Sequence, residues 1–202
     1  MSKLSPSRQT KILMVSLSLL FLASAVVARS TSISGIEKSL FLFIYHLPGF
    51  IAPIMHIVSQ FGSVMGMLIV CLCLLAIKKQ QIALDVFLSG WLAYIVATVG
   101  KVMVDRPRPT ELLENVSGRY GGALGPGFPS AHVAISTAVT FALFYCIPKN
   151  YRPLLYTWVV LIALSRMYLG VHLPLDTIGG FCIGMLAGFT VHQHARKSNA
   201  RT

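Results

Sequence analysis

Acidic residues are scarce in this chain. Only 6 of its 202 residues are Asp or Glu, against 17 Lys and Arg, and charged residues together make up 11%. Soluble domains carry about 25% charged residues, so this composition argues against a soluble fold. The hydrophobic fraction of 55% instead indicates an integral membrane protein, and the length fits a single domain over residues 1–202.

The chain also lacks a continuous basic face, despite a net charge of +11. Its lysines and arginines lie mainly between and beyond apolar runs, a pattern typical of membrane topology and contact with anionic headgroups. We therefore expect a lipid bilayer as partner and no nucleic acid. Neither the acidic residues nor the four cysteines have metal-ligand spacing, so we expect no metal, no other cofactor and no disulfide.

Long apolar runs are what the sequence has in abundance. They predict an all-α fold, a bundle of six transmembrane helices over residues 12–28, 51–77, 82–100, 129–147, 154–164 and 174–191. The first run is either a membrane helix, which its length favours, or a cleaved signal peptide. The shorter run 39–50 predicts a helix lying along the membrane interface, and the polar segment that follows residue 101 predicts an active-site loop.

Basic turns define one side of this bundle. If the six runs alternate in direction, then Lys78–Lys79, Lys149–Arg152 and the two basic tails share one side, which the positive-inside rule makes cytoplasmic. The ends of the third and fifth runs and the starts of the fourth and sixth then meet on the other side. These ends carry Lys101, Arg108, Ser130, His132, Arg166, His172 and Asp176.

The cations in this set are suited to holding a phosphoryl group. Lys101, Arg108 and Arg166 can surround its non-bridging oxygens and stabilise the charge that spreads over them in the transition state. Backbone N–H groups of residues 130–132, at the start of a helix, would add donors where the helix dipole favours an anion.

The two histidines supply the remaining chemistry. Neutral His172 can attack phosphorus to give a phosphohistidine, with Asp176 holding the imidazole ring and stabilising its developing positive charge. His132 can protonate the leaving group and then deprotonate the incoming water. The set predicts metal-independent phosphoryl transfer.

Three motifs in this region resemble the signature of the type 2 phosphatidic acid phosphatase superfamily, whose membrane members are six-helix lipid phosphatases. They are Lys101 with six residues to Arg108-Pro109, then Pro129-Ser130-Ala131-His132, then Ser165-Arg166 with five residues to His172 and three more to Asp176. The resemblance, over residues 101–176, implies phosphate binding by Lys101, Arg108, Ser130, Ala131 and Arg166 and catalysis by His132, His172 and Asp176.

The second motif departs from the usual pattern, because Ala131 stands where the family has glycine. Alanine keeps the backbone N–H, so we expect oxyanion binding to survive unless this position needs a left-handed backbone. Two other arginines, Arg106 and Arg119, lie in the same region and could contact a substrate headgroup. On the sixth run, Gly180, Gly184 and Gly188 predict close helix packing, within the bundle or between two chains.

The leading interpretation is a lipid phosphatase of the bacterial cytoplasmic membrane, with its site facing the extracytoplasmic side. Undecaprenyl diphosphate, phosphatidylglycerol phosphate and phosphatidic acid are candidate substrates. Two alternatives stay open at this stage. One is a phosphotransferase that passes the phosphoryl group to another lipid, and the other is a non-enzymatic binder or transporter of anionic lipids.

Overall fold

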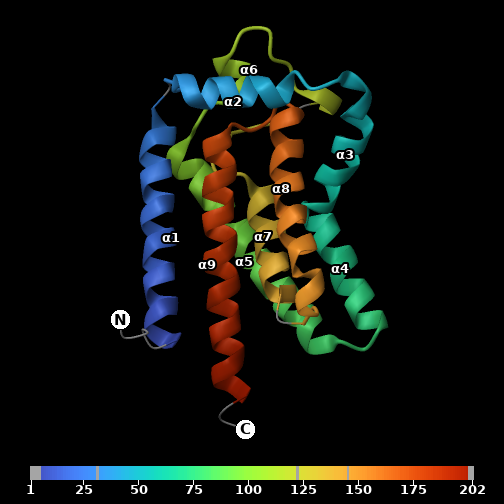
Figure 1. Ribbon diagram of the computed structural model, residues 1–202. Helices are drawn as coiled ribbons and strands as arrows, with labels where there is room; N and C mark the ends of the chain where they lie inside the picture. The colour runs from blue at the N-terminus through green and yellow to red at the C-terminus, as the bar shows by residue number, and fades with distance from the viewer. Residues whose placement is uncertain (1–5, 31, 122, 145, 200–202) are drawn as a thin grey trace.

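The computed structural model describes residues 6–30, 32–121, 123–144 and 146–199, and all regular structure within these ranges is helical. Figure 1 shows the arrangement. The helices in chain order are α1 (Pro6–Arg29), α2 (Gly35–Tyr45), η1 (Gly49–Ile51), α3 (Ala52–Phe61), α4 (Val64–Ala76), α5 (Gln80–Val104), α6 (Pro109–Leu112), η2 (Arg119–Gly121), α7 (Ala131–Phe144), η3 (Lys149–Tyr151), α8 (Arg152–Tyr168) and α9 (Pro174–Asn199).

Helix α7 is central to the bundle and packs on α5, α8 and α9. The glycines of α9 make its contact with α7 close. A side chain at Gly180 would collide with the carbonyl of Ser130, just before α7, and one at Gly184 with the backbone of α7 itself. One at Gly188 would collide with Phe141. The prediction that this glycine stripe serves packing within the bundle is therefore confirmed.

Three of the described helices are long and apolar enough to cross a membrane, in segments Arg8–Arg29, Gln80–Leu112 and Pro174–Ala195. A fourth crossing is added if the bent pair Gly35–Tyr45 and Gly49–Phe61 is counted as one broken span. The expectation of a single helix over 51–77 is wrong. The helix breaks after Phe61, and Ser63 caps the new helix α4 by accepting a hydrogen bond from the N–H of Gly66 at 3.3 Å.

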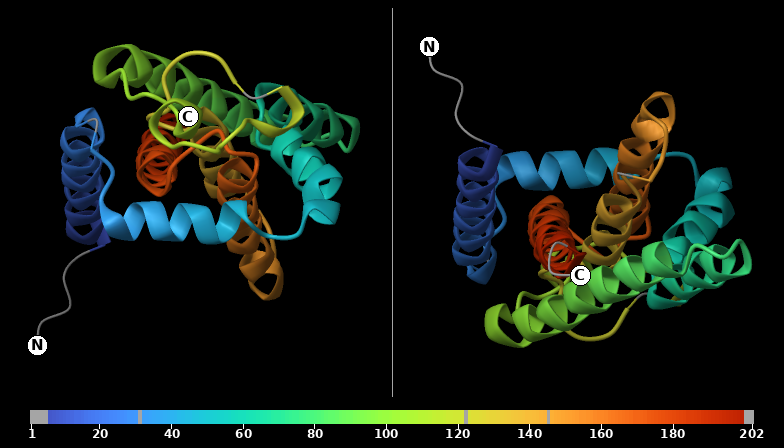
Figure 2. Two further views of the ribbon diagram at one scale, coloured as in Figure 1. Left: turned by 90° about the horizontal axis from the view of Figure 1, so that it is seen from above. Right: turned by 90° about the horizontal axis from the view of Figure 1, so that it is seen from below.

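Helix α2 lies across one end of the bundle, roughly perpendicular to the long helices (Figure 1; Figure 2, left). Its outer face is apolar, with Ile36 85% and Phe43 72% exposed, while Phe41 and Ile44 are buried in the cluster beneath it. An apolar outer face on a helix at the end of a bundle fits an interfacial helix. The helix begins at Gly35, four residues before the expected run, because Ser34 caps it.

Four helices, α1, α5, α8 and α9, are longer than their apolar runs predict. Helix α8 continues past residue 164 to Tyr168, so Arg166 lies in its last turn, and α9 continues past residue 191 to Asn199. Charged and polar residues at a helix end reduce the hydropathy without ending the helix. The described cysteines form no disulfide, and two of them, Cys73 and Cys146, are exposed.

The basic turns and the motif residues lie at opposite ends of the molecule. The turns at Lys78–Lys79 and Lys149–Arg152 are at the lower end in Figure 1, where α1 starts and α9 finishes. Helices α2 and α6 are at the upper end. Lys3 and Arg201, which belong to the basic tails, lie outside the described residues.

Candidate active site

The predicted site residues come together beneath α2. Lys101 lies in the last turn of α5, His132 in the first turn of α7, Arg166 in the last turn of α8, and Asp176 in the first turn of α9. The charges of Arg166, Lys101 and Arg108 act on both histidines, and His172 also acts on His132. The helix ends that alternate along the chain therefore do meet.

The end of α8 fixes how Arg166 and His172 are placed. The N–H of Val171 donates to the carbonyl of Arg166 at 3.2 Å, and the N–H of Gly170 donates to the carbonyl of Met167 at 2.9 Å. This is a Schellman motif, and it needs a left-handed residue, which Gly170 provides with a φ of 75°. The chain turns sharply at Gly170, two residues after α8 ends, and keeps His172 at the same end of the bundle as Arg166.

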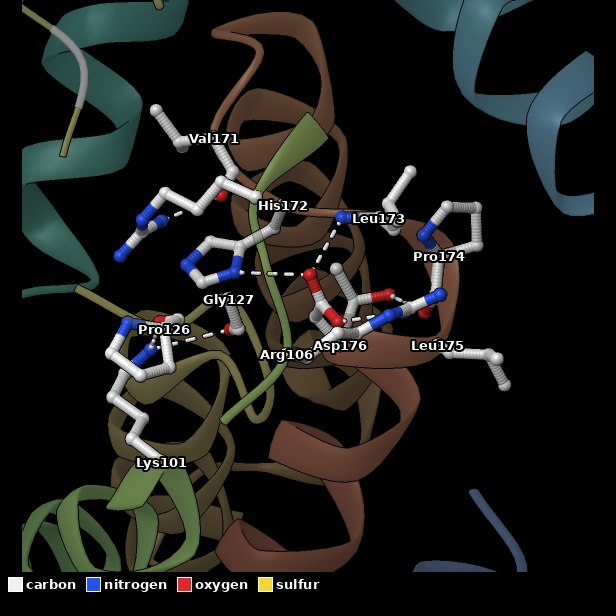
Figure 3. A network of polar contacts seen from close by, with 12 residues as sticks. Lys101, Arg106, Pro126, Gly127, Val171, His172, Leu173, Pro174, Leu175 and Asp176 are labelled. Atoms are coloured by element: carbon white, nitrogen blue, oxygen red, sulfur yellow. Dashed lines mark hydrogen bonds and ion pairs between the residues drawn. The ribbon is translucent and has the colours of Figure 1, made fainter. Parts of the chain in front are cut away.

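His172 is buried, and its ring faces Asp176 (Figure 3). Nδ1 of the imidazole lies 3.4 Å from Oδ2 of Asp176, a long contact that leaves Nδ1 without a regular hydrogen bond. Burial, followed by the positive charges of Arg166, Lys101 and Arg108, holds the pKa of His172 well below its ordinary value. The imidazole is therefore neutral at pH 7, the form that can act as a nucleophile.

Both oxygens of the Asp176 carboxylate are held. Oδ2 accepts a hydrogen bond from the N–H of Leu173 at 2.8 Å, and Oδ1 accepts one from Nη1 of Arg106 at 2.8 Å. The residues between the end of α8 and the start of α9 thus form a short loop that closes on the Asp176 side chain. This geometry keeps the carboxylate beside Nδ1 of His172.

Lys101 and Arg108 are wrapped by the loop that precedes α7. Lys101 Nζ donates to the carbonyls of Pro126 and Gly127 at 2.6 and 3.2 Å. Arg108 donates to Gly125 at 2.7 Å, to Leu124 at 3.1 Å and to Val171 at 2.6 Å. A lysine has three N–H donors and an arginine five, so each cation keeps donors for an oxyanion.

Arg166 and Ser130 carry polar atoms that are buried without a partner. Arg166 Nη1 donates to the hydroxyl of Ser59 at 2.7 Å, but its Nε has no hydrogen bond, and neither does Oγ of Ser130. Leaving a buried donor unpaired costs about 1–3 kcal/mol. An oxyanion bound between them would satisfy both groups.

The start of α7 contradicts the expectation that the N–H of Ser130 binds phosphate, and it shows which backbone conformation Ala131 adopts. The N–H of Ser130 donates to the carbonyl of Asp176 at 2.9 Å, so it does not serve as a donor to phosphate. Ala131 is the first residue of α7 and is not among the described residues with positive φ. Alanine in place of glycine therefore brings no backbone strain at this position.

Arg106 and Arg119, which could have contacted a headgroup, are engaged within the protein. Arg106 is 1% exposed and lies between the carboxylates of Glu37 and Asp176. The guanidinium of Arg119 stacks on the rings of Tyr45 and Tyr168, with its Cζ 4.7 and 4.1 Å from their centroids.

Two contacts of the site are not predicted by any sequence motif. Ser59 hydrogen-bonds Arg166 from α3, and Glu37 pairs with Arg106 from α2. Ser59 lies in an apolar run like many structural serines. For Glu37, the only signal in the sequence is that acidic residues are scarce. Among the described residues, no group of three or more His, Cys, Asp or Glu side chains is arranged to hold a metal ion.

Comparison with known proteins gives one family and several relatives. The family model described as PAP2 superfamily matches residues 81–200. The putative undecaprenyl-diphosphatase YbjG of Escherichia coli is 32% identical over 144 residues, 69% of this chain and 70% of that protein. The undecaprenyl-diphosphatase of Sulfolobus acidocaldarius is 29% identical over 163 residues, 77% of this chain and 76% of that protein.

A third relative, the lipid A 4'-phosphatase of Bacteroides thetaiotaomicron, is 31% identical over 112 residues, 54% of this chain. The match spans only about half of that protein, 49% of its length.

Two solved structures share the fold at 23% sequence identity. The first transmembrane PAP2 type phosphatidylglycerolphosphate phosphatase from Bacillus subtilis superposes with a TM-score of 0.78, covering 91% of this chain and 96% of that one. Aquifex aeolicus LpxE superposes with a TM-score of 0.72, covering 79% of this chain and 96% of that one.

Proposed function

The chain belongs to the PAP2 superfamily, and on this premise we propose that it is a single-domain, integral-membrane phosphatase that removes the terminal phosphate of a lipid. The observation that carries the proposal is the buried, neutral His172 backed by Asp176 and surrounded by the charges of Lys101, Arg108 and Arg166. Undecaprenyl diphosphate, phosphatidylglycerol phosphate and phosphatidic acid remain the candidate substrates.

The reaction proceeds in two displacements at phosphorus. Nε2 of His172 attacks, the bond from phosphorus to the lipid oxygen breaks, and His132 gives that oxygen a proton. The imidazole keeps its Nδ1 proton, which faces Asp176, so the phosphohistidine ring carries a positive charge beside the carboxylate. His132 then takes a proton from water, which displaces His172 and releases inorganic phosphate.

The phosphoryl oxygens lie among the cations in this scheme. Arg166 Nε and Ser130 Oγ are among the buried polar atoms that lack a partner, and both are suited to a phosphoryl oxygen. Lys101 and Arg108 supply their remaining donors, and the N–H of Ala131 at the start of α7 adds one more. Binding of this kind stabilises the transition state through charge and position, without a metal ion.

An apolar groove supports a lipid as the substrate. It has a volume of about 540 Å³, and its lining includes Val133, Phe144, Tyr156, Val160, Ile178 and Met185. Its lining comes mainly from α7, α8 and α9. Helices α8 and α9 both pack on α7 and stand apart in front of it in Figure 1. Val133 follows His132 directly, so the groove starts beside the site and runs about 16 Å along α7 to Phe144. We propose that the lipid tail of the substrate lies in it.

A bulky residue in this groove tests the assignment. Val160 is 55% exposed on α8, six residues or about 9 Å along the helix from Arg166, so tryptophan fits there without disturbing the core. We expect Val160→Trp to lower kcat/KM for dioleoyl phosphatidic acid about 10-fold and to leave dihexanoyl phosphatidic acid little changed, because short chains end before that part of the groove. Val26→Trp on the outer face of α1 is the matched control. Equal losses on both lipids would contradict a tail site.

Six crossings with an extracytoplasmic site complete the proposal. Helices α7 and α8 are shorter than the spans α5 and α9, but α7 packs between α5 and α9 and α8 packs on α7, which supports crossings by both. The basic turns at the end opposite the site support a cytoplasmic location for that end. We place the protein in a bacterial cytoplasmic membrane and leave its oligomeric state unassigned.

The test is a panel of lipid phosphates, assayed for released phosphate with purified protein in detergent, with and without a chelator. We expect release from at least one lipid at a rate that the chelator does not change. Phosphorylated acceptor lipid without free phosphate would instead favour a transferase. Tight binding without turnover would favour an anionic-lipid binder, and loss of activity with the chelator would contradict the metal-independent chemistry.

A further inference from the structure

On the side of Asp176 away from His172, Arg106 forms ion pairs with both Asp176 and Glu37. Nη1 of Arg106 donates a hydrogen bond to Oδ1 of Asp176 at 2.8 Å. Both amino groups also donate to Glu37, Nη2 to Oε2 at 2.8 Å and Nη1 to Oε1 at 3.1 Å. Figure 3 shows Arg106 beside the carboxylate that faces His172. The relative exposures of Glu37, Arg106 and Asp176 are 6%, 1% and 0%. The three charges are thus held away from water.

The net charge of Glu37, Arg106 and Asp176 is balanced when His172 is phosphorylated and not when His172 is neutral. Two carboxylates and one guanidinium leave a net charge of −1 next to a neutral His172. When His172 is phosphorylated its ring becomes positive, and the group becomes neutral. If Glu37 were uncharged, the positive charge of Arg106 would offset more of the charge of Asp176, and less negative charge would remain to stabilise the ring. A buried charge of this kind acts strongly because water does not screen it.

The geometry of the pair also limits what Arg106 can do to Asp176. A free guanidinium favours a bidentate grip on both oxygens of a carboxylate. Here Glu37 occupies the guanidinium, so Arg106 gives Asp176 a hydrogen bond on Oδ1 alone. Oδ2 stays available to the N–H of Leu173 and to the imidazole of His172.

Glu37 is well placed to transmit the position of α2 to the site. Its Oε1 also accepts a hydrogen bond from the N–H of Leu175 at 3.0 Å, at the start of α9. The residue belongs to α2, outside the residues 81–200 that the family model matches. One carboxylate therefore joins the interfacial helix to Arg106 and to the start of α9, which follows the loop that carries His172.

We propose that Glu37 and Arg106 are positioning residues, which hold the Asp176 carboxylate oriented toward His172 from the interfacial helix α2. The inference rests on the proposed phosphatase function. Neither residue touches the substrate, so the ground-state binding of a lipid phosphate does not depend on them, whereas formation of the phosphohistidine does.

The experiment compares Glu37→Gln with wild-type protein on the most active lipid of the panel. Glutamine keeps the shape of Glu37 and removes its charge. A misplacement of about 1 Å can cost about 10²-fold in rate, so we expect kcat to fall 10- to 100-fold with KM nearly unchanged. Glu37→Asp, which keeps the charge on a shorter arm, should recover part of the rate. Glu114→Gln, on an exposed residue of the loop before α7, is the matched control.

Inhibition by orthovanadate separates positioning from a purely structural role. Vanadate mimics the transition state at a phosphoryl-transfer site, so its inhibition constant should rise by the factor by which kcat falls. A lower melting temperature with unchanged kcat and unchanged vanadate inhibition would overturn the inference. If Glu37→Gln does not fold, Arg106→Lys tests the inference instead, because lysine keeps the positive charge but lacks the planar, forked donors of the guanidinium. We expect it to lower kcat at unchanged KM, and an unchanged kcat overturns the inference.

Failure of the proposed function gives a different result. In that case wild-type protein releases no phosphate from any lipid of the panel. If wild-type protein is active and Glu37→Gln is equally active, only the positioning role of Glu37 and Arg106 is contradicted. Arg29→Lys, on an exposed arginine at the end of α1, is the control for Arg106→Lys.

Discussion

Replacing His172 by alanine is expected to reduce phosphate release by about 10⁴-fold or more, the largest effect that we anticipate. The imidazole is the only candidate nucleophile that the structure places beside a carboxylate and within the field of the three cations, among the described residues. Without it the cations can still bind the phosphate. We therefore expect the lipid to bind His172→Ala with nearly wild-type affinity while turnover is lost.

The measurement is free phosphate released by purified protein in detergent, together with trapping of the phosphorylated protein from a radiolabelled substrate. Wild-type protein should give an acid-labile phosphoenzyme, and His172→Ala should give none. His194→Ala, on an exposed histidine of α9 far from the site, is the matched control. Unchanged phosphate release from His172→Ala would remove the nucleophile from the mechanism and the proposal with it.

Replacing Arg166 by alanine is expected to lower kcat by about 10²–10³-fold, the size of effect seen when one donor to a developing oxyanion is removed. Arg166 is buried, and its unpaired Nε is among the groups that an oxyanion would satisfy. Arg166→Lys should recover only part of the activity, because an ammonium cannot donate to two oxygens through a planar fork. Arg8→Ala, on an exposed residue at the start of α1, is the control.

Arg166→Ala should also change the pH dependence of kcat/KM. Burial is the largest cause of the low pKa of His172, and the charge of Arg166 is the next. Without that charge the pKa rises toward its ordinary value, so His172 becomes protonated at a higher pH. The acid limb of kcat/KM should therefore move to higher pH in Arg166→Ala. A limb that stays in place, with kcat unchanged, would mean that Arg166 lies too far from His172 to serve the reaction.

The order of the apolar runs and the motif spacing were sufficient to predict which residues meet. Successive membrane helices reverse direction, so Lys101, His132, Arg166 and Asp176 must reach one end of the bundle wherever each helix ends. The same pattern could not distinguish a continuous run from a broken one. Residues 51–77 look like one span, yet Ser63 caps a new helix after Gly62. Capping depends on a single hydroxyl that hydropathy does not register.

The sequence by itself determined an all-helical membrane protein, a set of cations suited to phosphate and a His172–Asp176 pair, all at common helix ends. These follow from local chemistry: apolar runs that must avoid water, and residues at fixed spacing along a helix. Only the tertiary structure decided that Arg106 is held by Glu37, that Ser59 meets Arg166, and that the N–H of Ser130 is taken by Asp176. Each of these contacts joins elements far apart in the chain, and a buried charge or donor accepts whichever partner the packing of the helices brings to it.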